Sequence, residues 1–290
     1  MDGTRIVDDS PGTADGDVSE AVRNTLCIPL WGRMLAAQHF PHLFPDHDAK
    51  RILAEMHCDL SSSKLFKLQY AYLDCAIRQY DFACEINAYL AEYPRACVVE
   101  LGAGLSVLRR QMQNESNAWY DLDHPQVIAL RRRHIPSGER ERNISCDLND
   151  LSWFDSIDLN PRDGIVFIAG GLFYYFTTKE VRRLLVAMAE RFRGGMIAFD
   201  TTNHRGLRGV NREVRMAGNA AKSYFSLEAP ARELEAWSPN IVNVRETDYM
   251  RGYQPSGFRP SLLTKLVMKI LTGVHMSFIV HAEFLQERTK

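Results

Sequence analysis

The chain has 290 residues, of which 46% are hydrophobic and 24% are charged, and its formal net charge is −1. A chain of this length and apolar content can bury one large core and carry an appended subdomain. Its near-neutral charge excludes a polycationic nucleic-acid binder, and it has neither an N-terminal apolar segment nor an apolar stretch of about 18 residues. We therefore expect a soluble, cytoplasmic protein whose partners include no nucleic acid and no membrane.

The six cysteines and nine histidines are scattered without metal-ligand spacing or a C-x-x-C pair. The cysteines stand at 27, 58, 75, 84, 97 and 146. Two of them fall in expected core strands, which favours small buried apolar side chains over disulfides. The sequence therefore predicts no metal site. The basic runs Arg109-Arg110 and Arg131-Arg132-Arg133 are interpreted as solvated helix faces.

The first 20 residues hold five Asp, one Glu, three Gly and a single Arg. Such a composition cannot bury itself, so residues 1–20 are predicted to be a disordered acidic tail. Residues 21–95 have helical periodicity and form the expected helical cap. From residue 96 to 290 strands and helices alternate, which predicts a parallel sheet covered on both faces.

The expected strands of this last region are 97–101, 118–122, 143–146, 164–169, 195–199, 241–248 and 277–284, and the expected helices are 105–113, 124–133, 178–192, 228–237 and 262–271. The last helix is amphipathic, with Lys265 and Lys269 on one side. A membrane-surface role is the alternative for this helix, but packing on the core is favoured.

The stretch Cys-Val-Val-Glu-Leu-Gly-Ala-Gly at 97–104 predicts a buried strand followed by a tight glycine turn. The next apolar run ends at Asp123, where a carboxylate can meet a ribose hydroxyl. Because ligands bind beyond the carboxyl ends of parallel strands, these residues mark a nucleoside site. The third strand runs into Asp147-Leu148, the fourth into Gly170-Gly171 and the aromatic run Phe173-Tyr174-Tyr175, and the fifth into Asp200 and His204.

The identity of the nucleoside follows from what the glycine turn lacks. A dinucleotide fingerprint needs a third glycine, which is missing after Gly104. Tyr175 and Lys179 match the Tyr-x-x-x-Lys spacing of short-chain dehydrogenases, but chance is the better account of that match. S-adenosylmethionine fits better because it has no pyrophosphate; Asp123 would hold its ribose and Asp147 its adenine. A turn residue before Pro125 and a helix N-cap remain the alternatives for these two acids.

The motifs Val-Val-Glu-Leu-Gly-Ala-Gly-Leu-Ser at 98–106 and Trp-Tyr-Asp-Leu-Asp-His-Pro at 119–125, with Ile-Ala-Gly-Gly-Leu-Phe-Tyr-Tyr-Phe at 168–176, resemble the leucine carboxyl methyltransferase superfamily, and within it the tetracenomycin-type polyketide O-methyltransferases. The resemblance covers about residues 64–285. It implies a class I methyltransferase Rossmann-like α/β fold, with a seven-stranded, mostly parallel sheet and an N-terminal helical cap. It also implies that Arg78 pairs with the cofactor carboxylate.

The expected binding residues for S-adenosyl-L-methionine are Arg78, Glu100, Gly102, Ala103, Gly104, Leu122, Asp123, Asp147, Leu148, Gly170 and Gly171. The sequence departs from the family at Gly170, where members often carry Glu. Backbone carbonyls near Ala169 to Gly171 would then contact the cofactor ammonium, or that contact would be weaker.

The expected reaction is O-methylation of a small molecule, at a carboxyl or hydroxyl of a polyketide-like or other secondary metabolite. Alignment of donor and acceptor can supply about 7–11 kcal/mol of the barrier. His204 and Tyr174 are the predicted catalytic residues, with His204 as the base that a phenol would need. A carboxylate acceptor would instead suit Arg205, Arg208 or Arg212 as an anchor, and the sequence leans towards that acceptor.

Two other classes remain open at this point: an NAD(P)-dependent oxidoreductase and a catalytically silent S-adenosylmethionine-binding protein. The sequence does not identify the acceptor or the oligomeric state, a homodimer included.

Overall fold

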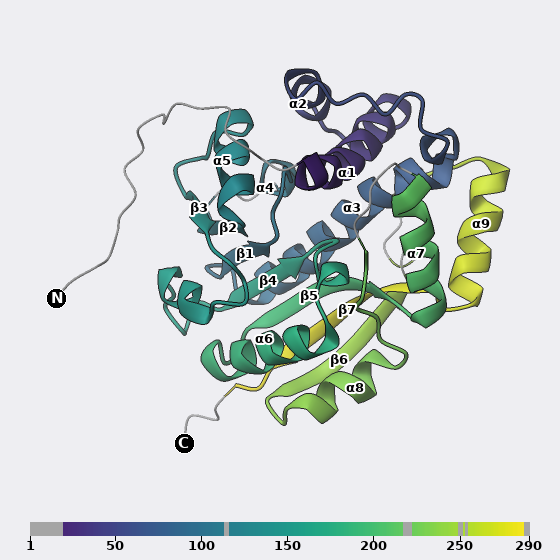
Figure 1. Cartoon of the computed structure of the whole chain (residues 1–290). Helices are drawn as coiled ribbons and strands as arrows, with labels where there is room; N and C mark the ends of the chain where they lie inside the picture. The colour runs from purple at the N-terminus through teal and green to yellow at the C-terminus, as the bar shows by residue number, and fades with distance from the viewer. Residues whose placement is uncertain (1–19, 113–115, 217–221, 249–251, 253–254, 287–290) are drawn as a thin grey trace.

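The computed structural model describes residues 20–112, 116–216, 222–248, 252 and 255–286. The expected acidic tail lies outside these residues apart from Glu20. Helices and strands alternate along most of the chain after a helical N-terminal part (Figure 1). None of the helices within the described ranges is long and apolar enough to cross a membrane.

Seven strands form one mixed sheet in the order β3-β2-β1-β4-β5-β7-β6. They are β1 (Cys97–Leu101), β2 (Trp119–Asp123), β3 (Glu141–Ser145), β4 (Ile165–Ala169), β5 (Met196–Thr202), β6 (Ile241–Asp248) and β7 (Ser277–Phe284). The first five run parallel, and β7 is antiparallel to both β5 and β6. This arrangement confirms the expected seven-stranded, mostly parallel sheet.

The central strands read as continuous apolar runs because both of their faces are covered. Every residue of β1, β4 and β5 is buried, whereas the edge strands β3 and β6 are only partly buried. One face packs against α6 (Thr178–Arg191) and α8 (Pro230–Trp237), and the other against α3 (Gln69–Glu92) and α9 (Leu262–Gly273). Two-sided burial of this kind is expected for parallel strands joined by crossover helices.

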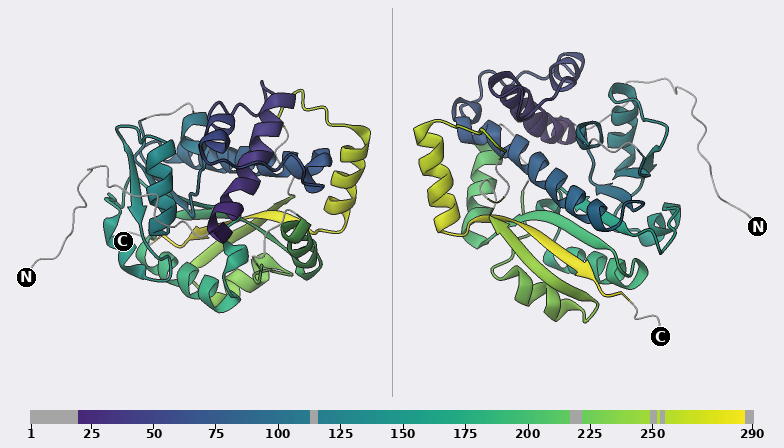
Figure 2. Two further views of the ribbon diagram at one scale, coloured as in Figure 1. Left: turned by 45° about the horizontal axis from the view of Figure 1, so that its top comes forward. Right: turned by 180° about the vertical axis from the view of Figure 1, so that it is seen from behind.

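The helical N-terminal part consists of α1 (Glu20–His39), α2 (Ala49–Glu55) and α3, which lie together on one side of the molecule (Figure 2). α1 approaches α3 closely at Gly32, where a Cβ atom would lie 2.9 Å from Cys75 Sγ. Glycine at this position therefore lets the two helices pack.

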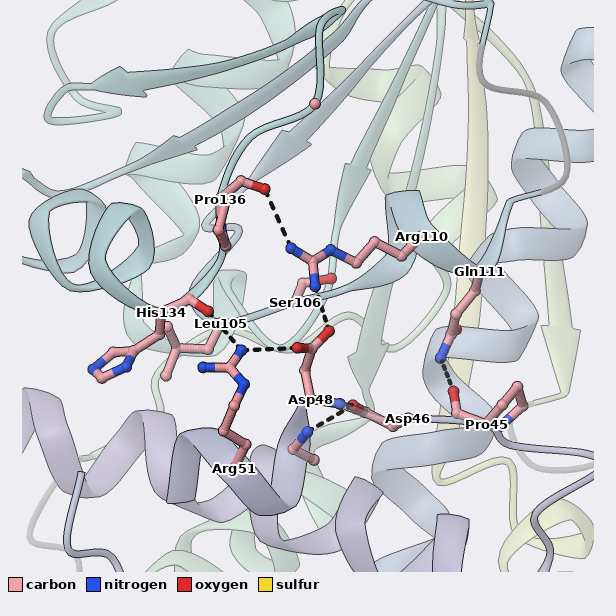
Figure 3. Close-up of polar contacts among 12 residues, drawn as sticks. Pro45, Asp46, Asp48, Arg51, Leu105, Ser106, Arg110, Gln111, His134 and Pro136 are labelled. Atoms are coloured by element: carbon pink, nitrogen blue, oxygen red, sulfur yellow. Dashed lines mark hydrogen bonds and ion pairs between the residues drawn. The ribbon is translucent and has the colours of Figure 1, made fainter. Parts of the chain in front are cut away.

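Ion pairs connect α2 to the sheet domain. Figure 3 shows Asp48 between Arg51 of α2 and Arg110 of α4 (Leu108–Gln111). Arg51 Nη2 donates to the carbonyl of His134 at 2.8 Å, at the end of α5 (Pro125–His134). Gln111 Nε2 donates to the carbonyl of Pro45 at 2.8 Å. Arg110 is exposed as predicted, but it is part of this contact rather than a purely solvated side chain.

A disulfide joins Cys27 of α1 to Cys58, which follows α2. This pair was not predicted from the sequence, whereas the two cysteines of the expected core strands, Cys97 and Cys146, are free and Cys97 is buried. Cys27 and Cys58 are 31 positions apart in the sequence, and no spacing motif marked them because the turn between α1 and α2 brings them together.

We expect loss of this disulfide to destabilise the cap, because closure of a loop of this length restricts the unfolded chain. Replacing both Cys27 and Cys58 by Ser should lower the free energy of unfolding by about 2–4 kcal/mol, measured by urea denaturation without reductant. Reductant should destabilise the wild type and leave the double variant unchanged. Equal stability of the two proteins without reductant would contradict the expectation.

The helix α7 (His204–Met216) lies in a segment for which the sequence predicted no helix or strand. Gly206 and Gly209 lower the helix propensity of this segment. The structure explains Gly206, because a Cβ atom there would lie 1.6 Å from Thr202 Oγ1 and 2.6 Å from the carbonyl of Met276. Packing of α7 against the end of β5 therefore requires glycine at 206. The same glycine lowers the helix propensity of the segment, so the helix could not be predicted from the sequence.

Candidate active site

A cavity of about 590 Å³ lies at the carboxyl ends of β1, β2, β4 and β5. Residues of α1 and α3 form its other wall, and α7 contributes Gly206, Gly209 and Val210. This volume is within the usual range for small-molecule and cofactor sites. The cap and the sheet therefore enclose one chamber between them.

The glycine turn after β1 forms part of the cavity wall. Gly102 and Gly104 have φ angles of +63° and +51°, a region that residues with side chains rarely adopt. A Cβ atom at Gly102 would also lie 2.5 Å from Leu172 Cδ1. The turn thus presents bare backbone to the cavity, with Ala103 between the two glycines.

Asp123, the last residue of β2, accepts two backbone hydrogen bonds beside this turn. Its Oδ2 accepts from Gly104 N at 2.8 Å and its Oδ1 from His124 N at 2.7 Å. Burial raises the pKa of this carboxyl above its ordinary value, against the lowering effect of these two bonds. Each oxygen keeps a further acceptor site, so the carboxylate can still bind a hydroxyl group in the cavity.

Arg131 of α5 supports the same turn from behind. Its guanidinium donates to the carbonyl of Ser106 at 2.6 Å and to that of Gly104 at 3.3 Å. It also pairs with Asp121 at 2.8 Å and with Glu141 at 3.2 Å. Only 1% of its surface is exposed, so the prediction of a solvated helix face is wrong for Arg131. Asp121 of β2 and Glu141 of β3 are both buried, and their carboxylates require a buried cation beside them.

Glu100 lies at the end of β1, lines the cavity and is buried. Its Oε2 has no hydrogen-bond partner among the described residues. Burial raises the pKa of Glu100 to about 7, against the opposing charge of Arg131. A buried acceptor without a partner is costly, and a donor group from a bound molecule would satisfy it.

The raised pKa of Glu100 predicts a pH-dependent stability. The folded state holds the proton more tightly than the unfolded chain, where the ordinary pKa is 4.5. The contribution of Glu100 to the free energy of unfolding is therefore fully present below about pH 4.5 and is lost as the pH rises to about 7. We expect the free energy of unfolding to fall by up to about 1.4 kcal/mol per pH unit in this window.

Urea denaturation at several pH values between about 5 and 8 would measure this fall. Glu100→Gln should remove it, whereas Glu235→Gln, at an exposed position of α8, should retain it. An unchanged slope in Glu100→Gln would contradict the assignment.

Arg78 of α3 and Asp200 of β5 form an ion pair at the cavity wall. Arg78 Nη1 lies 3.2 Å from Asp200 Oδ2, and Asp200 Oδ1 accepts from Gly171 N at 2.6 Å. A Cβ atom at Gly171, where φ is +69°, would lie 2.9 Å from Arg78 Nη1. Glycine at 171 therefore permits the guanidinium to approach. Asp200 was not among the predicted binding residues, although its place at the end of the fifth strand was a visible signal.

Gly170 departs from the family pattern for a steric reason. A Cβ atom at this position would lie 2.9 Å from Cε2 of Phe82 on α3. The ring occupies the space that a side chain at 170 would need. Asp200 stands on the adjacent strand, since β4 pairs with β5 through Ala169 and Phe199. The cavity thus has a carboxylate one strand away from the glycine.

The predicted binding residues divide into two groups. Those that line the cavity are Arg78, Glu100, Gly102, Ala103, Gly104, Asp123, Gly170 and Gly171. Leu122 and Leu148 instead belong to the apolar core under the sheet. Asp147 is exposed, and its Oδ1 accepts from Asn149 N at 2.9 Å in a local turn. The structure does not bring these last three residues to the cavity lining.

The two predicted catalytic residues are also separated. Tyr174 lines the cavity and is buried; burial, followed by the charge of Asp200, raises its pKa well above the ordinary value. His204 does not line the cavity; two thirds of its side chain is exposed, and it pairs with Glu228. The three arginines proposed to anchor a carboxylate, Arg205, Arg208 and Arg212, are exposed on α7 and do not line the cavity either.

Comparison with known proteins gives a consistent assignment. A family model for leucine carboxyl methyltransferases matches residues 28–189, more than half of the chain. TcmP of Streptomyces glaucescens, a tetracenomycin polyketide synthesis O-methyltransferase, is 25% identical over 76% of this chain and 80% of its own length. The S-adenosyl-L-methionine-dependent methyltransferase dpfgK of Gibberella zeae is 30% identical over 69% of this chain and 67% of its own length.

Two solved structures have the same fold at low sequence identity. A DUF574 family protein from Streptomyces avermitilis gives a TM-score of 0.53 at 14% identity and covers 81% of this chain and 90% of its own. A candidate methyltransferase from Thermobifida fusca gives a TM-score of 0.52 at 15% identity and covers 93% and 100%. These two structures show the fold alone. The family match and the 30% identity to dpfgK establish that the chain belongs to the leucine carboxyl methyltransferase family and is an S-adenosylmethionine-dependent methyltransferase.

Proposed function

We propose that this protein transfers the methyl group of S-adenosylmethionine to a hydroxyl oxygen of an apolar small molecule. The observation that carries the proposal is the cavity at the carboxyl ends of the strands, which has a polar wall at the strand ends and an apolar wall under the cap. Bound S-adenosylmethionine supplies an activated methyl group on a sulfonium centre. The protein then has chiefly to align that group with the acceptor oxygen.

The polar wall fits a nucleoside joined to an amino-acid end. Gly102 and Gly104 would let the nucleoside approach the backbone, and Asp123 would accept from the ribose hydroxyls. The partnerless Oε2 of Glu100 is a further acceptor in this wall. Arg78 and Asp200 present one positive and one negative group side by side, which complements the carboxylate and ammonium of an amino acid.

The apolar wall supports a neutral acceptor. It includes Leu26, Ile28, Leu65, Phe66 and Ala71. The two arginines of the cavity are engaged: Arg33 bonds to Asp46 at 2.9 Å and to the carbonyl of Leu105 at 2.7 Å, and Arg78 pairs with Asp200. A carboxylate acceptor would lose its hydration without gaining a dedicated guanidinium. The O-methyltransferase name of TcmP supports transfer to oxygen.

We assign to Asp74 the role of accepting the proton of the hydroxyl group. It stands one helical turn before Arg78 on α3 and lines the cavity beside the apolar wall. Asp74→Asn should lower kcat on a hydroxyl acceptor by about 100-fold, with a shift in the pH–rate profile. His204→Ala should leave kcat unchanged, since that side chain lies at the surface. The opposite pattern would return the base role to His204.

Transfer of a labelled methyl group from S-adenosylmethionine to a panel of apolar phenols and matched apolar carboxylic acids tests the function. Calorimetry with S-adenosylhomocysteine and with NAD(P) accompanies it. We expect the sulfur cofactor alone to bind and the phenols to be labelled. Absence of S-adenosylhomocysteine binding would overturn the proposal, and labelling of the acids alone would overturn the hydroxyl assignment. Binding of S-adenosylhomocysteine without transfer of the methyl group to any phenol or acid of the panel would instead indicate a catalytically silent binding protein.

A further inference from the structure

The helix α9 turns an apolar side to solvent. Leu262, Leu266 and Ile270, spaced four residues apart, are 84%, 54% and 54% exposed, while Thr264 and Met268 are buried against α3. Leu263 and Val274 are exposed beside them. The prediction that this helix packs on the core is therefore correct only for its narrower face. A contiguous exposed apolar surface usually marks an interaction site.

The apolar surface of α9 is edged by the two charged residues of the helix, both of them lysines. Lys265 and Lys269 are exposed one turn apart along one edge of it. The α9 patch is defined by these two lysines and the exposed apolar residues Leu262, Leu263, Leu266, Ile270 and Val274.

The helix α9 lies at the periphery of the molecule in all three views (Figures 1 and 2). Asn203, just before α7, donates from Nδ2 to the carbonyl of His275 at 2.8 Å, which ties the two segments together. α7 exposes Arg205, Arg208 and Arg212. On the inner side of α9, Leu271 lines the cavity. The same helix thus has an exposed apolar side and a side that reaches the candidate active site.

We propose that the α9 patch docks the protein on an anionic lipid surface. An apolar helix side edged by lysines suits the interface of a bilayer, where the leucines enter the acyl region and the ammonium groups meet anionic headgroups. A second copy of the chain fits less well. A two-fold pairing of α9 helices would bring Lys265 and Lys269 of one copy towards those of the other. The docking goes beyond methyl transfer and does not depend on it.

Co-sedimentation with vesicles tests the proposal. We expect the full chain to bind vesicles of phosphatidylcholine and phosphatidylglycerol at least about tenfold more strongly than vesicles of phosphatidylcholine alone, and added salt to weaken this binding. The double variant Lys265→Gln, Lys269→Gln should lose this preference. The double variant Leu266→Ser, Ile270→Ser should bind both vesicle types at least about tenfold more weakly.

Matched controls separate docking from general charge and folding effects. Lys179→Gln with Arg182→Gln removes two exposed cations of α6, and it should leave vesicle binding unchanged. Thermal unfolding should show that the Leu266→Ser, Ile270→Ser variant keeps its fold. The proposal is overturned if the wild type binds both vesicle types equally strongly, or if the Leu266→Ser, Ile270→Ser variant binds vesicles as strongly as the wild type. Sedimentation equilibrium showing a wild-type dimer that this variant converts to monomers would assign the patch to a second copy instead.

Discussion

Replacing Arg131 by Met is expected to lower the free energy of unfolding by about 3–5 kcal/mol, because the change leaves a buried carboxylate without its counter-charge. Asp121 is fully buried and lies 2.8 Å from the guanidinium, and Glu141 lies 3.2 Å from it. The methionine side chain fills similar space but donates no hydrogen bond. Chemical denaturation followed by circular dichroism measures the loss.

Two further variants make this expectation specific to the buried charge. Arg132→Met makes the same substitution at the exposed neighbouring position and should change stability by less than about 0.5 kcal/mol. Adding Asp121→Asn to Arg131→Met should recover part of the loss, because it removes the uncompensated charge. A loss in Arg131→Met no larger than that in Arg132→Met would contradict the prediction.

Removing either member of the Arg78–Asp200 pair is expected to weaken binding of S-adenosylhomocysteine. Hydrogen bonds to charged groups contribute about 1.5–3 kcal/mol each, so Arg78→Gln and Asp200→Asn should each lower the affinity by about 10- to 100-fold. The double variant should lower it by about 10²- to 10⁴-fold. Isothermal titration calorimetry measures these changes. Asn at 200 keeps an oxygen that can accept from Gly171 N, which limits damage to the loop.

5′-Methylthioadenosine provides the decisive comparison, since it has the same nucleoside but lacks the amino-acid end. Its affinity should be nearly the same for the wild type and for both variants. Arg95→Gln, which breaks the exposed Arg95–Asp163 pair, should affect neither ligand. If Arg78→Gln or Asp200→Asn weakened both ligands equally, the pair would support the fold of the cavity rather than bind the amino-acid end.

The sheet and the glycine turn could be predicted from local patterns. The expected bounds 97–101, 241–248 and 277–284 agree with β1, β6 and β7, because continuous apolar runs and flanking turn residues are properties of neighbouring residues. The positive φ angles of Gly102 and Gly104 follow from the same local logic. Asp123 was also visible, since a strand end after an apolar run is a local signal.

Other features were decided by contacts between distant segments. Arg131 is one of three adjacent arginines in the sequence, and only the packing of α5 on β2 and β3 buries it beside Asp121. The Cys27–Cys58 disulfide and the position of α7 against Thr202 likewise depend on neighbours far along the chain. Sequence spacing carries no information on which of several similar side chains will meet a partner.

The sequence by itself determined the fold class, the family and the edge of the sheet at which the glycine turn and Asp123 meet, because strand periodicity, the glycine turn and the acid after β2 are encoded within short segments. Only the tertiary structure decided which side chains surround the cavity. It placed Asp200 beside Arg78 and kept His204 at the surface, and it turned the leucines of α9 outward. Side-chain direction depends on how helices are oriented against the sheet, and that orientation is set by the whole core.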